Sequence, residues 1–392
     1  MTLKRTPART ISLNAVLLGG YLLASGCSRL HPKLQKQYVY VTAKQTYLRD
    51  RVAAVSNRTG TVSNGDELEV LEHGRRFLRV RTAKGEQGWI DEKVVAPQEV
   101  SKGFDDLKSE HAKDTAVASA VVRDDVYLHL KPGRDTEKLF RLQEGEKLIL
   151  LRRATLEKTL PPGQKAAPPP VLLPPSTHKS STGKTVPAVV LPSGPPMEDW
   201  WLVRDSKDRT GWLLSRMMDV DAPESLTRYA EGQRLVGAYL LRKINDPDAP
   251  MDDKNVPEYV TVLSPYKAGL PYDFDQVRVF TWNAKKHRYE TGFRERNIEG
   301  YLPLQIEIAT DPYSKGPAAA VLAPTFSYRV LSADAPAVTP DPVTGSVVPS
   351  QTFTKTYRLE GSLVRRVLAP NVPAPEPAHP QPIAEKKMRK RR

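Results

Sequence analysis

The residue types that usually catalyse reactions are few in this chain and scattered along it. The only cysteine is Cys27, so neither an intramolecular disulfide nor a cysteine-rich metal motif can form. The histidines form no HExxH or HxH motif, and no Gly-x-Ser-x-Gly occurs. They are His31, His73, His111, His129, His178, His287 and His379. The sequence therefore predicts no zinc site, no catalytic nucleophile and no cofactor.

Two weaker signals for chemistry remain. Asp273, Asp275 and Glu290 lie among aromatic residues, and a glycosidase needs only two carboxylates, which can be far apart in sequence. Gly183-Lys184-Thr185 has the ending of a phosphate-binding loop, but His178 occupies the position of the required first glycine. We interpret the second match as chance and predict that the protein is not an enzyme.

The surroundings of Cys27 are those of a secretion signal. Residues 1–10 are basic and polar, and residues 11–23 form an uncharged apolar run. The run is too short to span a bilayer as a helix but suits the apolar part of a signal peptide. The small residues Ala24, Ser25 and Gly26 precede the cysteine, as processing requires.

This segment resembles a bacterial lipoprotein signal peptide. The resemblance implies that residues 1–26 are removed and that Cys27 receives diacylglycerol, followed by a tether over 27–38. Acyl chains would then hold the protein on a membrane. Leu23 stands one place earlier than the usual lipobox leucine, and Ser28 favours the outer membrane by the sorting rule of Gram-negative lipoproteins. The alternatives are an ordinary signal peptide with an incidental cysteine and an uncleaved anchor.

Two stretches of the chain repeat one pattern of short strands separated by turns. Phe77–Ile90 and Trp200–Leu213 are equally long, and both contain a Gly-Trp pair. The matched positions are Val80 with Val203, Arg81 with Arg204, Lys84 with Lys207, Gly88 with Gly211, Trp89 with Trp212, Tyr47-Leu48 with Tyr127-Leu128, and Gly65–Leu68 with Gly145–Leu148. Such runs are typical of small all-β units. The sequence predicts a duplication, with units at 39–97 and 119–222.

Each unit resembles a bacterial SH3-like (SH3b) domain. The resemblance rests on an opening strand with an arginine, a Gly-x-x-Leu-x-Val segment, an aromatic-x-x-Val-Arg strand and the closing Gly-Trp pair. The first unit carries them as Tyr47-Leu48-Arg49, Gly65–Val70, Phe77–Arg81 and Gly88-Trp89. The second departs at Leu128-His129-Leu130. The implied fold is a small β-barrel that binds peptides or cell-wall material.

Aromatic residues of the two units are the candidates for ligand contact. They are Tyr47, Trp89, Tyr127, Trp201 and Trp212. The alternative is that the tryptophans are core residues, since they offer the largest area for burial in a small barrel. Gly88 and Gly211 precede two of them, and we expect these glycines to allow close backbone approach or a positive φ.

Proline-rich segments interrupt and link these units. Residues 155–197 are inserted in the second unit where the first has a short hairpin loop, and we predict that they are disordered and form no β-ladder. The insert is either a spacer or a docking segment for a partner. The apolar spacing in 99–112 predicts a helix within a linker over 98–118. A second short helix should begin near Pro223, with Asp221 as its N-cap.

A third β-rich region covers residues 223–370, and its family is not identified. We expect an antiparallel domain, either a small sandwich or a highly curved sheet. Its aromatic residues form either a core or a sugar- or peptide-binding face, and they are Tyr259, Tyr266, Tyr272, Phe274, Phe280, Trp282, Tyr289, Phe293 and Tyr301. Residues 371–392 are predicted to be a disordered basic tail. The predicted fold class is mainly β: two SH3-like barrels, this domain, and disordered proline-rich connections.

The formal net charge of +14 points to anionic partners such as membrane headgroups or cell-wall polymers. We see no basic stripe on a folded face, so we expect no nucleic-acid binding. The favoured function is a non-catalytic cell-envelope lipoprotein that faces the periplasm and binds peptidoglycan peptides or an envelope protein. The alternative is an assembly scaffold that recruits a partner through the proline-rich insert. The sequence does not give the oligomeric state.

Overall fold

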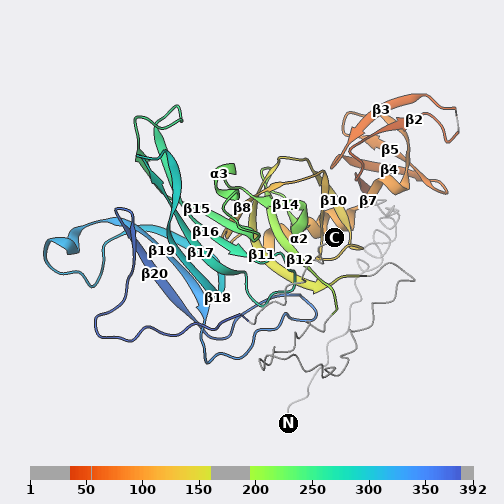
Figure 1. Cartoon of the computed structure of the whole chain (residues 1–392). Coiled ribbons are helices and arrows are strands. Elements are labelled where there is room, and N and C mark those ends of the chain that lie inside the picture. The colour runs from red at the N-terminus through yellow and green to blue at the C-terminus, as the bar shows by residue number, and fades with distance from the viewer. Residues whose placement is uncertain (1–35, 54, 160–194, 381–392) are drawn as a thin grey trace, which may run out of the picture. The chain divides into compact units, whose positions relative to one another are not determined.

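The computed structural model describes residues 36–53, 55–159 and 195–380, which form three seven-stranded antiparallel sheets (Figure 1). The predicted mainly β fold is confirmed. The signal peptide, Cys27, most of the proline-rich insert and the basic end of the tail lie outside the described residues.

The first sheet is a small barrel with an apolar interior. Its strands are β1 (Gln37–Val41), β2 (Gln45–Arg49), β3 (Arg58–Ser63), β4 (Glu67–His73), β5 (Phe77–Thr82), β6 (Gln87–Asp91) and β7 (Val95–Pro97), with the 3-10 helix η1 (Glu92–Val94) before β7. They pair in the order β3-β2-β6-β5-β4-β1-β7. Alternate residues of each strand point inward, and these include Val41, Leu48, Leu68, Val80 and Ile90.

The second sheet has the same strand order, strand for strand. It contains β8 (Ala118–Val122), β9 (Val126–His129), β10 (Lys138–Leu142), β11 (Lys147–Glu157), β12 (Met197–Asp205), β13 (Thr210–Leu214) and β14 (Met218–Val220), with η2 (Ser215–Met217) before β14. The order β10-β9-β13-β12-β11-β8-β14 repeats that of the first sheet when each strand number is raised by seven. The matched residues of the two sequence units therefore occupy matched strands.

The proline-rich insert begins later and ends earlier than the sequence predicts. Thr155, Leu156 and Glu157 continue β11 and pair with Asp199, Glu198 and Met197 of β12. The Thr155 hydroxyl also donates a hydrogen bond to Asp199 Oδ1 at 2.8 Å. The prediction that residues 155–197 form no ladder is thus wrong at both ends, because β11 continues to Glu157, before the first proline, Pro161, and β12 begins at Met197, directly after Pro196.

Two helices connect the sheets. Helix α2 (Gln98–Glu110) covers the stretch in which the sequence predicts one, with Val100 and Phe104 buried and Leu107 half-buried. Helix α3 (Glu224–Thr227) begins after Pro223, which occupies the N-cap position without a side-chain hydrogen bond. Asp221 is therefore not the N-cap; its carboxylate instead accepts a hydrogen bond from Lys147 at 3.0 Å.

The third sheet is a single curled meander and not a sandwich (Figure 1). Its strands, hydrogen-bonded in sequence order, are β15 (Arg234–Asn245), β16 (Asn255–Ser264), β17 (Phe274–Asn283), β18 (Arg288–Ala309), β19 (Ala323–Leu331), β20 (Thr352–Glu360) and β21 (Leu363–Arg366). The first half of β18 pairs with β17 and its second half with β19. The sequence signal misses this second half, which carries Pro303 and the charged Glu307.

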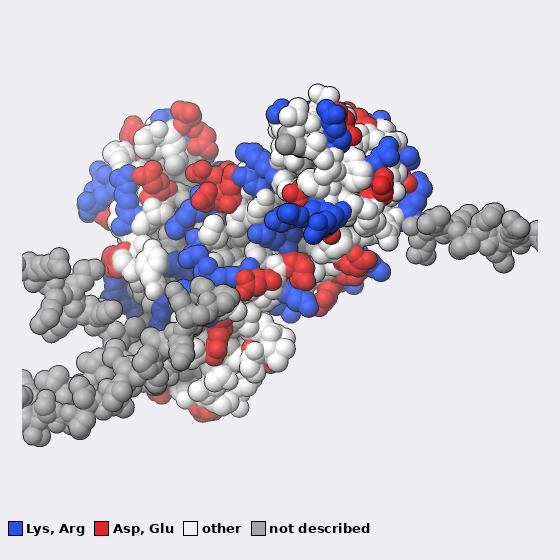
Figure 2. All heavy atoms as spheres, turned by 90° about the vertical axis from the view of Figure 1, so that its right-hand side faces the viewer, with Lys and Arg blue, Asp and Glu red and all other residues white. Residues whose placement is uncertain are grey.

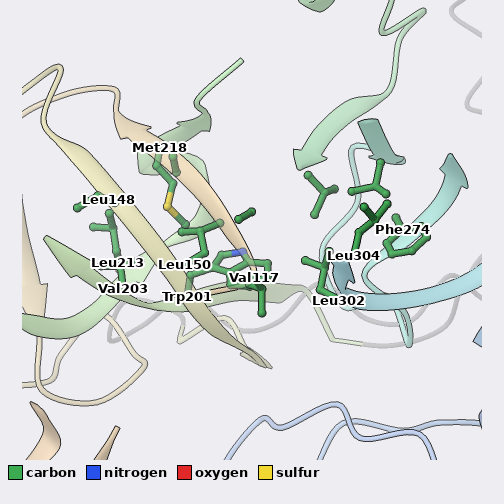
Figure 3. Packing of buried hydrophobic residues seen from close by; sticks show 14 of the residues in the cluster. Val117, Leu148, Leu150, Trp201, Val203, Leu213, Met218, Phe274, Leu302 and Leu304 are labelled. Carbon is green, nitrogen blue, oxygen red and sulfur yellow. The ribbon is translucent and has the colours of Figure 1, made fainter. Parts of the chain in front are cut away.

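The second and third sheets share one apolar cluster (Figure 3). It includes Trp201 and Val203 from β12 together with Phe274, Leu302 and Leu304 from the third sheet. A buried ion pair joins the same two sheets, because Arg153 Nε of β11 lies 2.9 Å from Asp273 Oδ1.

Candidate functional site

A groove of about 600 Å³ on the first barrel is lined by aromatic and cationic side chains. Its lining comes from the loop after β2, the turn between β4 and β5, the start of β5, the end of β6 and η1. The lining residues are Val52, Gly74, Arg75, Arg76, Phe77, Trp89, Asp91 and Lys93. The volume lies within the usual range for small-ligand sites. We call it the Trp89 groove.

Strand alternation places Trp89 in this groove. Its neighbours Gly88 and Ile90 on β6 point into the barrel and are buried, so Trp89 points outward and is half-buried. Gly74 lets the β4–β5 turn approach the indole, since a Cβ at position 74 would lie 3.1 Å from Trp89 Cζ3. The ring is therefore held against a tight turn, with its outer surface open to the groove.

Cations surround this ring. Arg49 of β2 and Arg79 of β5 are the direct cross-strand neighbours of Trp89. Arg79 lies 3.8 Å from Glu72 in an exposed ion pair, which offsets little of its charge. In the described part of the chain, Arg75, Arg76 and Lys93 form no ion pair.

One carboxylate lines the groove, and it already has a structural role. Asp91 Oδ1 accepts a hydrogen bond of 2.9 Å from the backbone N–H of Lys93 and thereby caps η1. Its charge offsets part of the positive potential without closing the groove. The result is an aromatic surface inside a cationic rim.

The equivalent position in the second barrel is closed. Trp212 of β13 lies opposite His129 of β9, as Trp89 lies opposite Arg49. Trp212 is only 9% exposed and Trp200, which matches Phe77, only 2%. Leu202 and Leu214 replace Arg79 and Asp91 and are also buried, so a patch of apolar side chains replaces the cationic rim.

An ion pair links the loop between β9 and β10 of the second barrel to β12. Arg134, in the loop between β9 and β10, donates three hydrogen bonds to Glu198 of β12, two from Nε and one from Nη2, including Nε to Oε2 at 2.9 Å. Both side chains are largely buried, at 33% and 12% exposure. No such pair restrains the corresponding loop of the first barrel among the described residues.

The structure separates the five aromatic residues that the sequence selects. Trp89 lines the groove, while Trp201 and Trp212 lie in the packed interior, which is the alternative stated for the tryptophans. Their burial favours the core alternative over ligand contact, because the second unit turns both faces of β12 into packed surfaces. Tyr47 and Tyr127 lie on the outer face beneath a cation, Arg58 at 3.8 Å and Lys138 at 5.2 Å from the ring centres.

Sequence reasoning missed the cationic rim. It found no basic stripe on a folded face, yet the structure brings together Arg49, Arg79 and the cations of the β4–β5 turn. A signal was present, since the outward positions of β5 begin Phe-x-Arg-x-Arg directly after Arg75-Arg76. Figure 2 shows lysine and arginine side chains in groups on the face turned to the viewer, with acidic residues among them.

The aromatic residues of the third sheet are mostly core. Phe274, Phe280 and Tyr301 are almost fully buried, whereas Tyr266 is 75% exposed. Trp282 is half-buried and lines a pocket of about 340 Å³ with Tyr229, Met251 and Arg288, and its indole N–H donates to Asp246 at 2.7 Å. The aromatic side chains of this region therefore form mainly a packed interior and not a binding face.

The three candidate glycosidase carboxylates each have a structural partner. Asp273 pairs with Arg153, and Asp275 accepts a hydrogen bond from Gln233 at 3.2 Å. Burial raises the pKa of Asp275. Hydrogen bonds from Lys286 and Asn283 lower the pKa of Glu290 to about 2. Cations thus compensate the charges of Asp273 and Glu290, whereas Asp275 has only a neutral hydrogen-bond partner.

Two features are absent from the described residues. No cluster of three or more histidine, cysteine, aspartate or glutamate side chains could hold a metal ion there. Within the same residues, no helix is long and apolar enough to cross a membrane.

Comparison with known families identifies the first barrel. Residues 45–96 match the model of the family described as Bacterial SH3 domain, which confirms the resemblance of the first unit over that range. A domain of this family indicates a cell-wall or protein-binding module. A comparison of the whole chain with curated protein sequences finds no match.

Solved structures give only distant likenesses. NlpC2 from Trichomonas vaginalis is 9% identical with a TM-score of 0.14, and the match covers 50% of this chain and 54% of that protein. An NlpC/P60 family protein from Bacillus cereus is 9% identical with a TM-score of 0.20, covering 66% and 99%. NlpC1 from Trichomonas vaginalis is 7% identical with a TM-score of 0.14, covering 65% and 87%. Thus the chain spans about half the length of the first of these proteins, and at such TM-scores the likenesses carry no conclusion.

Proposed function

We propose that this chain is a non-catalytic cell-envelope lipoprotein that binds peptidoglycan peptides or an envelope protein through the Trp89 groove. The single observation that carries the proposal is an aromatic ring left open, inside a cationic rim, on the barrel that matches a binding-module family. A half-buried tryptophan held in a groove is the kind of residue that provides most of the energy of a binding site.

The second barrel, 119–222, is in this proposal a second bacterial SH3 domain with a structural task. Its strand order supports the assignment. Its tryptophan is buried and its loop is held by the Arg134–Glu198 pair. It also shares an apolar cluster with the third sheet. It would therefore connect the ligand-binding barrel with the third sheet and would not add a second equivalent site.

The proposed location is the periplasmic face of the outer membrane, with acylated Cys27 as the anchor. The support is the signal-peptide pattern over residues 1–27 and the serine that follows. Cys27→Ser in the full chain tests it. The unaltered protein should partition with membranes and the variant should not, and equal partitioning of both would refute the anchor.

Sedimentation with purified peptidoglycan tests the binding role. The chain from residue 28 onward should co-sediment with the cell wall, and Trp89→Ala should abolish this. Tyr313→Ala is the matched control. It removes another aromatic side chain, which is 44% exposed and lies in the loop between β18 and β19 of the third sheet. If the unaltered fragment stays in the supernatant and also fails to capture an envelope protein by crosslinking in cells, the binding role is wrong.

A further inference from the structure

The cationic rim of the Trp89 groove is not something that the barrel fold requires. The second barrel has the same strand order, yet at matched positions it carries His129 instead of Arg49 and Leu202 instead of Arg79. A barrel of this kind therefore folds without these arginines. Their presence in the first barrel needs a reason other than stability.

The charges of the rim are largely uncompensated. Arg49 donates to the neutral Ser56 hydroxyl at 2.8 Å, and Arg75, Arg76 and Lys93 have no ion pair among the described residues. The Asp91 carboxylate is engaged at the start of η1. Several like charges held around one groove repel one another, and an anion placed among them relieves this repulsion. Arginines in particular bind carboxylates through paired hydrogen bonds.

The floor and wall of the groove add an apolar requirement. Trp89 and Phe77 are half-buried there, and Val52 at the rim is 51% exposed. A purely charged polymer would leave these side chains without contacts. A peptide can bring both kinds of group, because an extended backbone presents every second side chain on the same face, so carboxylates two positions from an apolar side chain face the groove with it.

We propose that the ligand of the Trp89 groove is an extended peptide with carboxylates flanking an apolar side chain. This rests on the proposed function, whose binding site it specifies. In the complex, the apolar side chain packs on Trp89 and Phe77, and the carboxylates pair with Arg49, Arg75 and Arg76.

The positive charge of the rim also argues against one candidate ligand, the proline-rich insert of this chain. The proline-rich residues 160–194 of this chain contain Lys165, Lys179 and Lys184 and no aspartate or glutamate. A cationic segment placed in a cationic groove is repelled, so the rim selects against the chain's own insert.

Two synthetic peptides test the proposal by fluorescence polarisation with the chain from residue 28 onward. One has Glu two positions before and two positions after a central Leu in an otherwise Ala strand, so that all three side chains share one face, and the other has Gln for every Glu. The Glu peptide should bind and weaken with added salt, and the Gln peptide should bind at least about ten-fold more weakly. Equal binding of the two peptides would overturn the proposal.

A pair of double variants with equal changes in net charge makes the test specific. Arg75→Glu with Arg76→Glu should weaken binding of the Glu peptide at least about ten-fold. Lys44→Glu with Lys84→Glu changes two exposed cations that do not line the groove. This double variant should leave the affinity for the Glu peptide within about two-fold of that of the unaltered chain. Equal losses would show a general charge effect and refute the proposal.

The remaining outcomes separate this proposal from the one on which it rests. If Trp89→Ala abolishes wall binding but the Arg75/Arg76 variant does not weaken it, the groove is the site and the carboxylate requirement is wrong. If inorganic polyphosphate or single-stranded nucleic acid binds more tightly than the Glu peptide, a peptide is the wrong class of ligand. If neither Trp89→Ala nor the arginine variant affects wall binding, the proposed site itself is wrong.

Discussion

Gly211 of β13 lies so close to Leu128 of β9 that a Cβ at position 211 would be 2.8 Å from Leu128 Cβ. Gly88 stands in the same relation to Leu48 in the first barrel, again at 2.8 Å. Neither glycine has a positive φ, so close approach between strands is the reason for both. The Gly-Trp pair thus marks, in each barrel, the place where β6 or β13 crosses the neighbouring strand.

Alanine at either glycine should destabilise its barrel. The added methyl group would overlap a leucine side chain and a backbone carbonyl, and neither can move without disturbing the core. Overpacking of this kind costs about 1–3 kcal/mol. Urea unfolding of Gly88→Ala and Gly211→Ala measures the loss. Ala83→Gly in the exposed β5–β6 turn is the control, and a loss as large as that of the glycine variants would show that the crossing is not tight.

The two equivalent tryptophans should respond differently to truncation. Trp212 is buried among Trp200, Leu202 and Leu214, so Trp212→Ala should cost about 3–5 kcal/mol in free energy of unfolding. Trp89 is half-buried, so Trp89→Ala should cost clearly less while removing ligand binding. Thermal or urea unfolding beside the sedimentation assay measures both properties. A Trp89 variant that is as unstable as the Trp212 variant would mean that Trp89 is a core residue.

The repeat could be predicted because its spacing is tied to backbone contacts. Tyr-Leu, Gly-x-x-Leu and Gly-Trp recur in both units since each marks a strand crossing or an inward side chain, and those positions depend on local sequence. The same holds for the strands of the third sheet with clear alternation. The second half of β18 escaped prediction because Pro303 and the charged Glu307 interrupt the apolar pattern, although β19 still pairs with this half.

The binding site was only half predictable. Trp89 stands out by residue type. Its exposure and the burial of Trp212 depend on the side chains next to each ring, where the second barrel has leucines in place of Arg79 and Asp91. Sequence alone does not show that these positions lie beside the tryptophan. The cations of the rim come from β2, β5, the β4–β5 turn and η1. Their convergence follows from the strand order, which is a property of the whole barrel.

A buried carboxylate in the third sheet should make the stability of the chain sensitive to acid. Glu295 accepts hydrogen bonds from Lys355, Tyr328 and Tyr357, the last at 2.8 Å. Burial alone would raise its pKa, but these three donors outweigh burial and hold the pKa below its ordinary value. A depressed folded-state pKa contributes stability above the ordinary value near 4.5, and this contribution is lost as the pH falls from there through the folded-state value.

Glu295→Gln should therefore be most damaging near neutral pH. It would leave Lys355, whose side chain is 4% exposed, without its counter-charge, at a cost of about 3–5 kcal/mol. The difference from the unaltered chain should shrink as the pH falls below about 4.5, because Glu295 is then protonated as well. Urea unfolding between pH 3 and pH 7 measures it. Glu307→Gln, an exposed carboxylate on the same strand, should show little difference at any pH, and a constant difference for Glu295→Gln would contradict the assignment.

Removal of the proline-rich insert decides between the two functions that the sequence allows. The deletion must keep Glu157 and Met197, because these residues close the β11–β12 ladder. Deleting 160–194 shortens the loop between Glu157 and Met197 from 39 residues to four, and closure entropy depends logarithmically on loop length, so stability should rise by about 2 kcal/mol. Wall and peptide binding should persist, since the Trp89 groove belongs to the first barrel. A deleted chain that still folds, judged by a cooperative unfolding transition at least as stable as that of the unaltered chain, but no longer captures its partner in cells would instead support the scaffold function.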